Sequence, residues 1–148
     1  MPESWVIDAS VAAKWYLRDE ANLEQADAVQ NAHDRGDVVL TAPRFFSYEV
    51  LAVIRNAIAA RHITPADAAR FSQQFVASEF VTAPESESDL FLLRAHRLSL
   101  RYGCSFYDAL YLELAEELGW RFLTAERRLT QLLARRAPYL VELRNYQA

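Results

Sequence analysis

Four acidic side chains lie at positions where their carboxylates could meet. Asp8 ends an apolar run beginning at Trp5, which is typical of a buried strand in a parallel sheet. Glu49, Asp108 and Glu126 each fall at the start of a predicted helix, and Glu126 also follows a predicted strand. Strand ends and the helix starts that follow them share one edge of an α/β sheet. The four carboxylates could therefore face one crevice.

A hard divalent cation is one reason for a protein to keep such a group. Clustered carboxylates repel one another, so an empty cluster costs stability. Mg²⁺ prefers oxygen ligands, keeps several waters and takes only one or two carboxylates directly. Mn²⁺ accepts the same ligands. Sites of this kind typically act on phosphate esters.

Each acid also has a purely structural interpretation. Asp8 could cap the helix after it. Asp108 stands three residues after Ser105, which is the spacing of a capping box. Glu49 and Glu126 sit where the helix dipole favours acids. Helical phase places Asp108 at the edge of an apolar stripe, and the residues alone leave both interpretations open.

Short apolar runs alternate with helical patterns along the chain. Strands are predicted at 5–7, 38–41, 80–82, 120–124 and 139–143, and helices at 11–17, 22–35, 45–61, 65–78, 86–101, 105–118 and 126–136. Ser10 is the expected N-cap of the first helix, and Thr64 with Asp67 forms a strong start for the fourth. The alternation predicts a parallel sheet covered on both faces.

Composition restricts the class of protein. A chain of 148 residues with a net charge of −4 fits one domain and does not suggest a bulk nucleic-acid binder, although a local basic patch could still occur. Cys104 is the only cysteine, so an internal disulfide is impossible, and we interpret it as a small core residue. No apolar run approaches the roughly 20 residues that span a membrane, and no signal-peptide pattern opens the chain. A cytoplasmic protein is expected.

Four segments, in this order and spacing, resemble a PIN-domain ribonuclease, and specifically the VapC-type toxins of bacterial toxin–antitoxin pairs. The segments are 6–11, 43–50, 105–111 and 122–126. The resemblance covers essentially the whole chain, so residues 1–148 are expected to form a single nuclease domain. It implies a three-layer α/β/α sandwich with a mostly parallel five-stranded sheet.

The resemblance also implies how the protein acts. It predicts a metal-dependent endoribonuclease that hydrolyses RNA with activated water and Mg²⁺, or Mn²⁺ as a substitute, held by three or four of the acids Asp8, Glu49, Asp108 and Glu126. The family more often has Asp after Thr-Ala, so Glu126 is a departure. Ser10 and Thr124 would support the metal or the scissile phosphate. Lys14, Arg18 and Arg44 lie near the site in sequence and could hold the RNA backbone, or could be ordinary surface charges.

A homodimer that also binds a small antitoxin protein is the assembly that the resemblance implies. Aromatic residues cluster at helix starts, at Phe45, Phe46, Tyr48 and Phe106, and aromatic residues are enriched at interfaces. Core packing is the competing explanation for most of them.

Other classes of protein fit less well. A receiver domain needs an acidic pair by the first strand, and a haloacid-dehalogenase-type phosphatase needs an aspartate where Ser10 stands. The three histidines lack zinc-ligand spacing. The serious alternative is a catalytically weak PIN-like module that only binds RNA or a protein, and retention of all four acids favours the enzyme.

Overall fold

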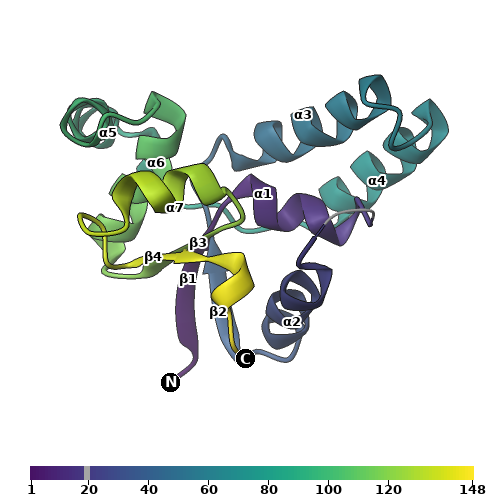
Figure 1. Ribbon diagram of the computed structural model, residues 1–148, viewed down its shortest axis with the longest axis horizontal. Helices are drawn as coiled ribbons and strands as arrows, with labels where there is room; N and C mark the ends of the chain where they lie inside the picture. The colour runs from purple at the N-terminus through teal and green to yellow at the C-terminus, as the bar shows by residue number, and fades with distance from the viewer. Residues whose placement is uncertain (19–20) are drawn as a thin grey trace.

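Four parallel strands form the sheet in a computed structural model that describes residues 1–18 and 21–148. The strands are β1 (Glu3–Ile7), β2 (Val38–Thr41), β3 (Arg121–Thr124) and β4 (Leu140–Glu142), in the spatial order β2-β1-β3-β4. Val6 pairs with Thr41 on one side and with Phe122 on the other. Because all strands run the same way, their carboxyl ends share one edge of the sheet (Figure 1).

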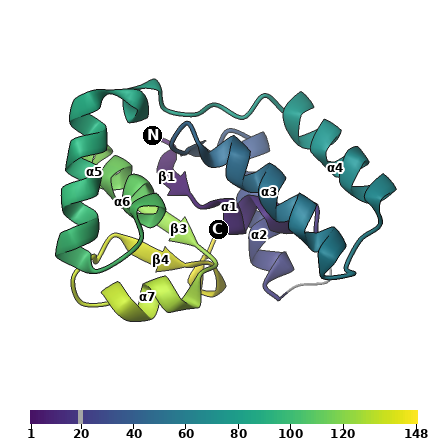
Figure 2. The ribbon, with the colours of Figure 1, turned by 90° about the horizontal axis from the view of Figure 1, so that it is seen from above.

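Helices flank the sheet and rise beyond its carboxyl edge. They are α1 (Ala9–Ala12), α2 (Leu23–Asp34), α3 (Phe46–Ala59), α4 (Pro65–Ala77), α5 (Asp89–Tyr102), α6 (Phe106–Leu118) and α7 (Arg127–Leu133), with 3-10 turns at Ala13–Trp15, Pro84–Glu87 and Leu143–Asn145. Helix α6 packs against β1 and β3, α2 against β2, and α7 against β4. Helices α3 and α4 pack side by side on one side of the molecule, and α5 and α6 pack together on the other (Figure 2).

The core explains why the central strands read as continuous apolar runs. Val6 and Ile7 of β1 and Phe122 and Leu123 of β3 are all fully buried, as expected for strands covered on both faces. Phe46 of α3 is fully buried as well. The predicted parallel α/β class is therefore confirmed.

The predicted fifth strand does not form in the described part of the chain. The segment at 80–82 approaches the end of β2, where Thr41 Oγ1 donates to Val81 O at 3.3 Å. Beyond it, only an isolated bridge joins Pro43 to Ala83. Proline has no N–H to donate, so Pro43 ends β2 and prevents a longer ladder there. The sheet thus has four strands, all parallel, rather than five mostly parallel ones.

Two predicted helix starts had different outcomes. Thr64 and Asp67 form the predicted capping box, with both reciprocal hydrogen bonds at 3.1 Å. Ser10 as an N-cap was wrong, because α1 begins directly after β1 and Asp8 occupies the cap position with extended backbone. Ser10 lies inside α1, and its hydroxyl accepts a hydrogen bond from Ala125 N at 3.0 Å.

The described helices are all too short or too polar to cross a lipid bilayer.

Candidate active site

Asp8 lies at the bottom of the site because β1 delivers it to the carboxyl edge of the sheet. Its residue is only 7% exposed, and the Thr124 hydroxyl at the end of β3 donates to Oδ2 at 2.7 Å. Burial raises the pKa of Asp8 to about 7; the bond from Thr124 opposes the shift, and the charge of Glu49 adds to it. Asp8 is therefore a carboxylate that is held in place but electrostatically costly.

Glu49 approaches from the first turn of α3. The Tyr111 hydroxyl donates to its Oε1 at 2.6 Å. Burial raises the pKa of Glu49, the bond from Tyr111 opposes this, and the charges of Asp108 and Glu126 raise it further. Glu49 is therefore repelled by two acids that lie on other elements, Asp108 and Glu126.

Asp108 enters from the first turn of α6 and differs from an ordinary capping acid. Its backbone N–H donates to Ser105 Oγ at 3.0 Å, so the predicted cap is present. Burial nevertheless raises the pKa of the Asp108 carboxyl, with Ser105 and Arg128 opposing the shift. In the exposed capping box, by contrast, hydrogen bonds from Thr64 lower the pKa of Asp67. The half-buried Asp108 therefore carries a cost that the cap alone does not explain.

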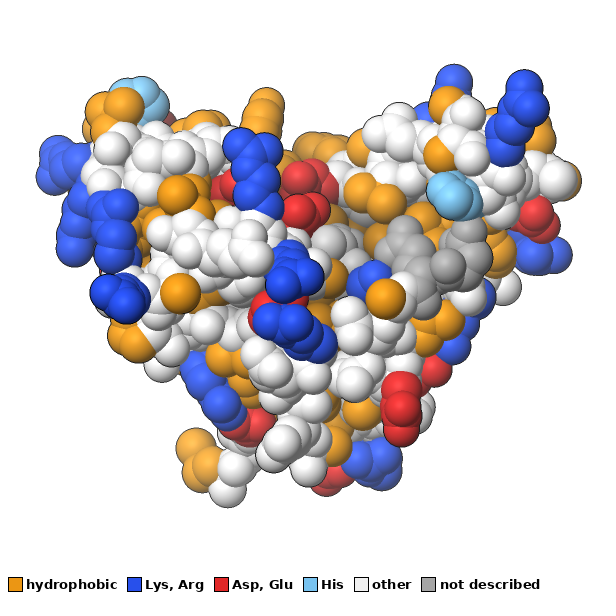
Figure 3. All heavy atoms as spheres, in the orientation of Figure 1, with side chains coloured by type: hydrophobic (Ala, Val, Ile, Leu, Met, Phe, Trp, Pro, Cys, Tyr) orange, Lys and Arg blue, Asp and Glu red, His pale blue; other side chains and the backbone are white. Residues whose placement is uncertain are grey.

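Glu126 is exposed and lies between the other acids as the N-cap residue of α7. Its backbone N–H donates to Thr124 Oγ1 at 3.0 Å. It lines two neighbouring cavities. One, of about 270 Å³, also contains Asp8 and Glu49, and the other, of about 280 Å³, also contains Asp108. Glu126 thus lies between Asp108 on one side and Asp8 with Glu49 on the other, and the two cavities form one cleft. Figure 3 shows acidic side chains gathered in the hollow between the two groups of helices.

The four acids share a cleft without forming a closed ligand set. Among the described residues, no group of three or more His, Cys, Asp or Glu side chains is arranged to hold a metal ion. The donors nevertheless fit Mg²⁺, since it needs only one or two direct carboxylates and keeps its waters. Burial is the first cause of the raised pKa values of Asp8, Glu49 and Asp108, and a cation bound beside them would stabilise their charged forms.

The hydroxyl groups of Thr124 and Ser10 make hydrogen bonds within the protein at the site. Thr124 is fully buried, donates to Asp8 and accepts from the Glu126 N–H. Its hydroxyl is therefore engaged within the protein and orients Asp8. The Ser10 hydroxyl bonds to Ala125 N and also lowers the pKa of Asp8. Both groups connect β1 to the end of β3.

The three predicted RNA-binding cations occupy different surroundings. Lys14 is buried in the wall of the cavity that contains Asp8. Arg18 forms a two-pronged ion pair with Asp27 at 2.7 Å for each contact, which fits the surface-charge interpretation. Arg44 is half-exposed beside Glu87 at 3.6 Å.

Two residues that sequence reasoning missed also belong to the site. Arg128 of α7 lines the cavity beside Asp108. Its position two residues after Glu126, in the first turn of a helix at the site, was an available signal. Tyr111 contacts Glu49, but because it lies in the apolar stripe of α6, the sequence indicated only a core residue.

Cys104 is half-buried against the core, and burial raises the pKa of its thiol, so it is a poor nucleophile.

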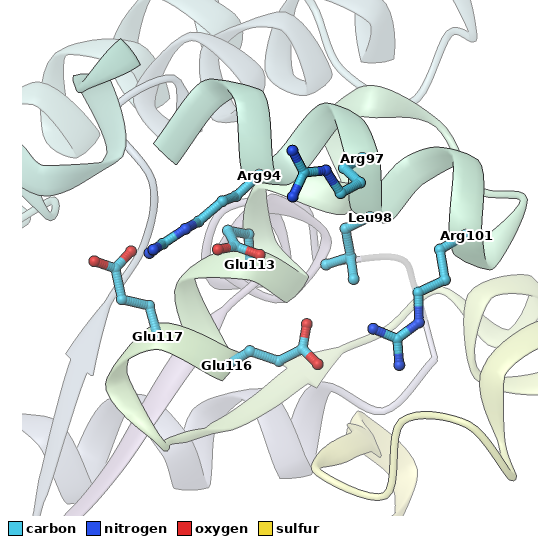
Figure 4. A pocket seen from close by; sticks show the side chains of 7 residues that line it. All are labelled: Arg94, Arg97, Leu98, Arg101, Glu113, Glu116 and Glu117. Atoms are coloured by element: carbon cyan, nitrogen blue, oxygen red, sulfur yellow. The ribbon is translucent and has the colours of Figure 1, made fainter. Parts of the chain in front are cut away.

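A second cleft is lined by charges of both signs (Figure 4). Arginines of α5 and glutamates of α6 interleave around about 340 Å³, with Leu98 at its floor. Burial raises the pKa of Glu113, and the Arg94 charge opposes that shift. Because opposite charges already face one another, this cleft needs no added cation. The lining charges are Arg94, Arg97, Arg101, Glu113, Glu116 and Glu117.

Comparisons with known proteins identify the family and the fold. Residues 5–133 match the family model described as PIN domain. The chain is 29% identical over 127 residues to Ribonuclease VapC3 of Pyrobaculum aerophilum, which covers 85% of this chain and 92% of the relative. The crystal structure of PAE2754 from Pyrobaculum aerophilum superposes with a TM-score of 0.65 at 23% identity, covering 97% of this chain and 93% of the other. That structure supports the fold.

Proposed function

The chain belongs to the PIN-domain family, and from this premise we propose that residues 1–148 form a single domain that cleaves RNA internally with Mg²⁺ or Mn²⁺. It is the VapC-type toxin of a toxin–antitoxin pair. The observation that carries the proposal is the cleft in which burial raises the pKa values of Asp8, Glu49 and Asp108, and in which the charges of neighbouring acids raise those of Asp8 and Glu49 further. The relative named as a VapC ribonuclease supports the same substrate class.

Each residue of the site has its own role in the proposed hydrolysis of the phosphodiester. The ion, when bound, would stabilise charge on the phosphate oxygens and ease the deprotonation of water. Asp8 and Asp108 would hold the ion, and Thr124 keeps Asp8 in one orientation. Glu49 or Glu126 would orient the attacking water or hold a second ion, and a carboxylate within hydrogen-bond reach of that water can accept its proton. No covalent intermediate with the protein is required.

Basic side chains lie beside the acids, and we assign to them the contact with the RNA backbone. Lys14 lies in the wall of the Asp8 cavity, and Arg128 lies beside Asp108. Arg44 is half-exposed at the loop that precedes α3. Arginine matches phosphate geometry well. Arg18 contributes less, because Asp27 already engages both prongs of its guanidinium.

Partners follow from the same premise. The protein is a homodimer that binds a small antitoxin protein, and its substrate is RNA. Exposed aromatic side chains support a protein contact, since Tyr48 is 76% and Tyr107 60% exposed. Aromatic residues of this kind are enriched at interfaces.

One observation favours a second function, that of a catalytically weak RNA-binding or protein-interaction module. The acids of the described residues do not form a closed ligand set. Such a module would bind RNA without cutting it.

Metal-dependent cleavage separates the two functions. The parent protein and Asp8→Asn should be incubated with unstructured RNA in EDTA and in Mn²⁺, with cut sites mapped by gel. We expect cleavage only by the parent with Mn²⁺, since the substitution removes the buried charge but keeps an acceptor for Thr124. Equal, metal-independent products from both proteins would point to a contaminating nuclease. An inactive parent that binds RNA would establish the module.

A further inference from the structure

A buried tyrosine hydroxyl connects three elements beneath the site. Tyr111 lies on α6, three residues after Asp108, and is 1% exposed. Its hydroxyl donates to Glu49 Oε1 on α3 at 2.6 Å. The backbone of Ala9, the residue after Asp8, is also near enough to this hydroxyl to oppose the rise in its pKa. One oxygen atom thus contacts two elements that carry site acids, while its own helix carries a third.

The ring that carries this hydroxyl is fixed by its neighbours. It stacks on Phe122 with a centroid distance of 5.3 Å and an interplanar angle of 3°. Phe45, at the start of α3, meets it edge-on with centroids 5.4 Å apart. Packing on two sides holds the hydroxyl at one point. A hydrogen bond from a fixed donor restricts the rotamers of a long, flexible glutamate.

We propose that Tyr111 is a positioning residue for Glu49: its hydroxyl holds Oε1 and leaves Oε2 for the ion or the attacking water in the cleft shared with Asp8 and Glu126. This inference rests on the proposed function, because it assigns a role to Glu49 in that reaction. It adds a residue that contacts neither RNA nor ion. Tyr111 acts only through the carboxylate that it orients.

The test uses Tyr111→Phe, which removes the hydroxyl and keeps the ring. The matched control is Tyr102→Phe. Tyr102 is also buried, at 3% exposure, and also donates to a glutamate, Glu116 Oε1 at 3.3 Å, but between α5 and α6 and outside the cleft. Binding of Mn²⁺ is measured by titration calorimetry on the metal-free protein, and RNA cleavage is followed at saturating Mn²⁺.

Tyr111→Phe should weaken Mn²⁺ binding roughly tenfold, the size expected for losing a hydrogen bond to a charged group. Tyr102→Phe should bind Mn²⁺ as the parent does. A tyrosine that only packs the core would lower the melting temperature without changing the affinity for Mn²⁺. A folded Tyr111→Phe protein in which both the affinity for Mn²⁺ and the rate of RNA cleavage at saturating Mn²⁺ equal those of the parent would therefore overturn the inference.

A double-mutant comparison tests whether Tyr111 acts through Glu49. In a Glu49→Gln background, Tyr111→Phe should change Mn²⁺ affinity by less than about twofold, because effects on a shared path do not add. The same tenfold loss in both backgrounds would contradict the proposal.

A further variant covers failure to fold. Should Tyr111→Phe not give the circular dichroism spectrum of the parent, Glu49→Asp tests the contact from the other side. It keeps the charge but withdraws the carboxylate from the hydroxyl, and Mn²⁺ affinity equal to the parent's would refute the role of the contact. A parent protein that neither binds Mn²⁺ nor cleaves RNA would refute the proposed function itself, and this inference with it.

Discussion

For the single residues of the site, the main effect of burial is on the pKa of each carboxyl group. Asp8, Glu49 and Asp108 have raised pKa values, with burial as the first cause in each case. Such a group folds more favourably with its proton bound. In the metal-free protein these acids therefore oppose folding at neutral pH, and a cation that binds them reverses that effect.

Asp8→Asn should stabilise the metal-free protein, and more so at higher pH. The pKa of Asp8 rises from 3.8 to about 7 on folding, so between pH 4 and 7 the folded state holds a proton that the unfolded chain has released. The unfolding free energy of the parent then falls as pH rises through this window, by about 1.4 kcal/mol per pKa unit. Thermal melts in EDTA at pH 5 and pH 8 should show a larger advantage for the mutant at pH 8.

Asp67→Asn is the control, because we expect it to lower the stability of the protein where Asp8→Asn raises it. Bonds from Thr64 lower the pKa of Asp67, so its charged form stabilises the fold above the unfolded pKa and that contribution disappears as pH falls. This mutant should be less stable than the parent at both pH values. A pH-independent Asp8→Asn advantage would contradict the assigned burial.

Glu126→Gln should cost less RNA cleavage than Asp8→Asn or Asp108→Asn. Glu126 is exposed and caps α7, whereas the other two acids are buried or half-buried in the cleft. We expect roughly 100-fold losses in kcat/KM for the two aspartates, comparable with removal of other groups that stabilise charge in a transition state. Equal losses for all three substitutions would show that Glu126 is a full ligand.

At the scale of elements, helix starts bring the acids to the sheet edge. Helices α3, α6 and α7 each begin at the cleft, and each carries one acid there, at Glu49, Asp108 and Glu126. A helix N-terminus tolerates an acid through its dipole. The element therefore offsets part of the repulsion that the cluster creates.

Asp108→Asn distinguishes a cap from a metal ligand at the start of α6. The backbone bond to Ser105 survives the substitution, so the cap remains. In EDTA the mutant should melt at or above the parent temperature, because a buried charge is removed. With Mn²⁺ at about 100 times its dissociation constant, the parent should gain about 2.7 kcal/mol and the mutant much less. A mutant destabilised in EDTA and a parent indifferent to Mn²⁺ would leave only the cap.

At the scale of the whole molecule, two groups of helices flank one cleft. Helices α3 and α4 lie on one side and α5 to α7 on the other, with the carboxyl edge of the sheet between them (Figures 1 and 2). Exposed aromatic side chains occur on both sides, at Tyr48 and Tyr107. Each is the neighbour in sequence of a site acid, Tyr48 of Glu49 and Tyr107 of Asp108.

The isolated protein should be a dimer in solution. Burying exposed aromatic side chains is favourable, and association depends on protomer concentration. Light scattering at tens of micromolar protein should give about twice the mass of one chain. Tyr48→Glu, on a side chain 76% exposed, is expected to shift the mass towards the monomer. A monomeric parent at that concentration would contradict the predicted assembly.

Features that depend on neighbours along the chain could be predicted without the structure. The apolar run before Asp8 predicted a buried parallel strand, and Thr64 with Asp67 predicted a helix start; both are present. The order of strands and helices also predicted the sheet edge at which the acids lie. These features follow from local periodicity and capping, which a single sequence displays directly.

Other features depend on burial and on contacts between distant residues, which exist only in the folded protein. Asp67 and Asp108 both follow a hydroxyl residue by three positions, yet folding lowers the pKa of one and raises that of the other. The segment after α4 looked like a strand, but Pro43 at the end of β2 leaves it a single bridge. Tyr111 found its partner Glu49 62 residues away. No pattern along the chain records which side chains the fold brings face to face.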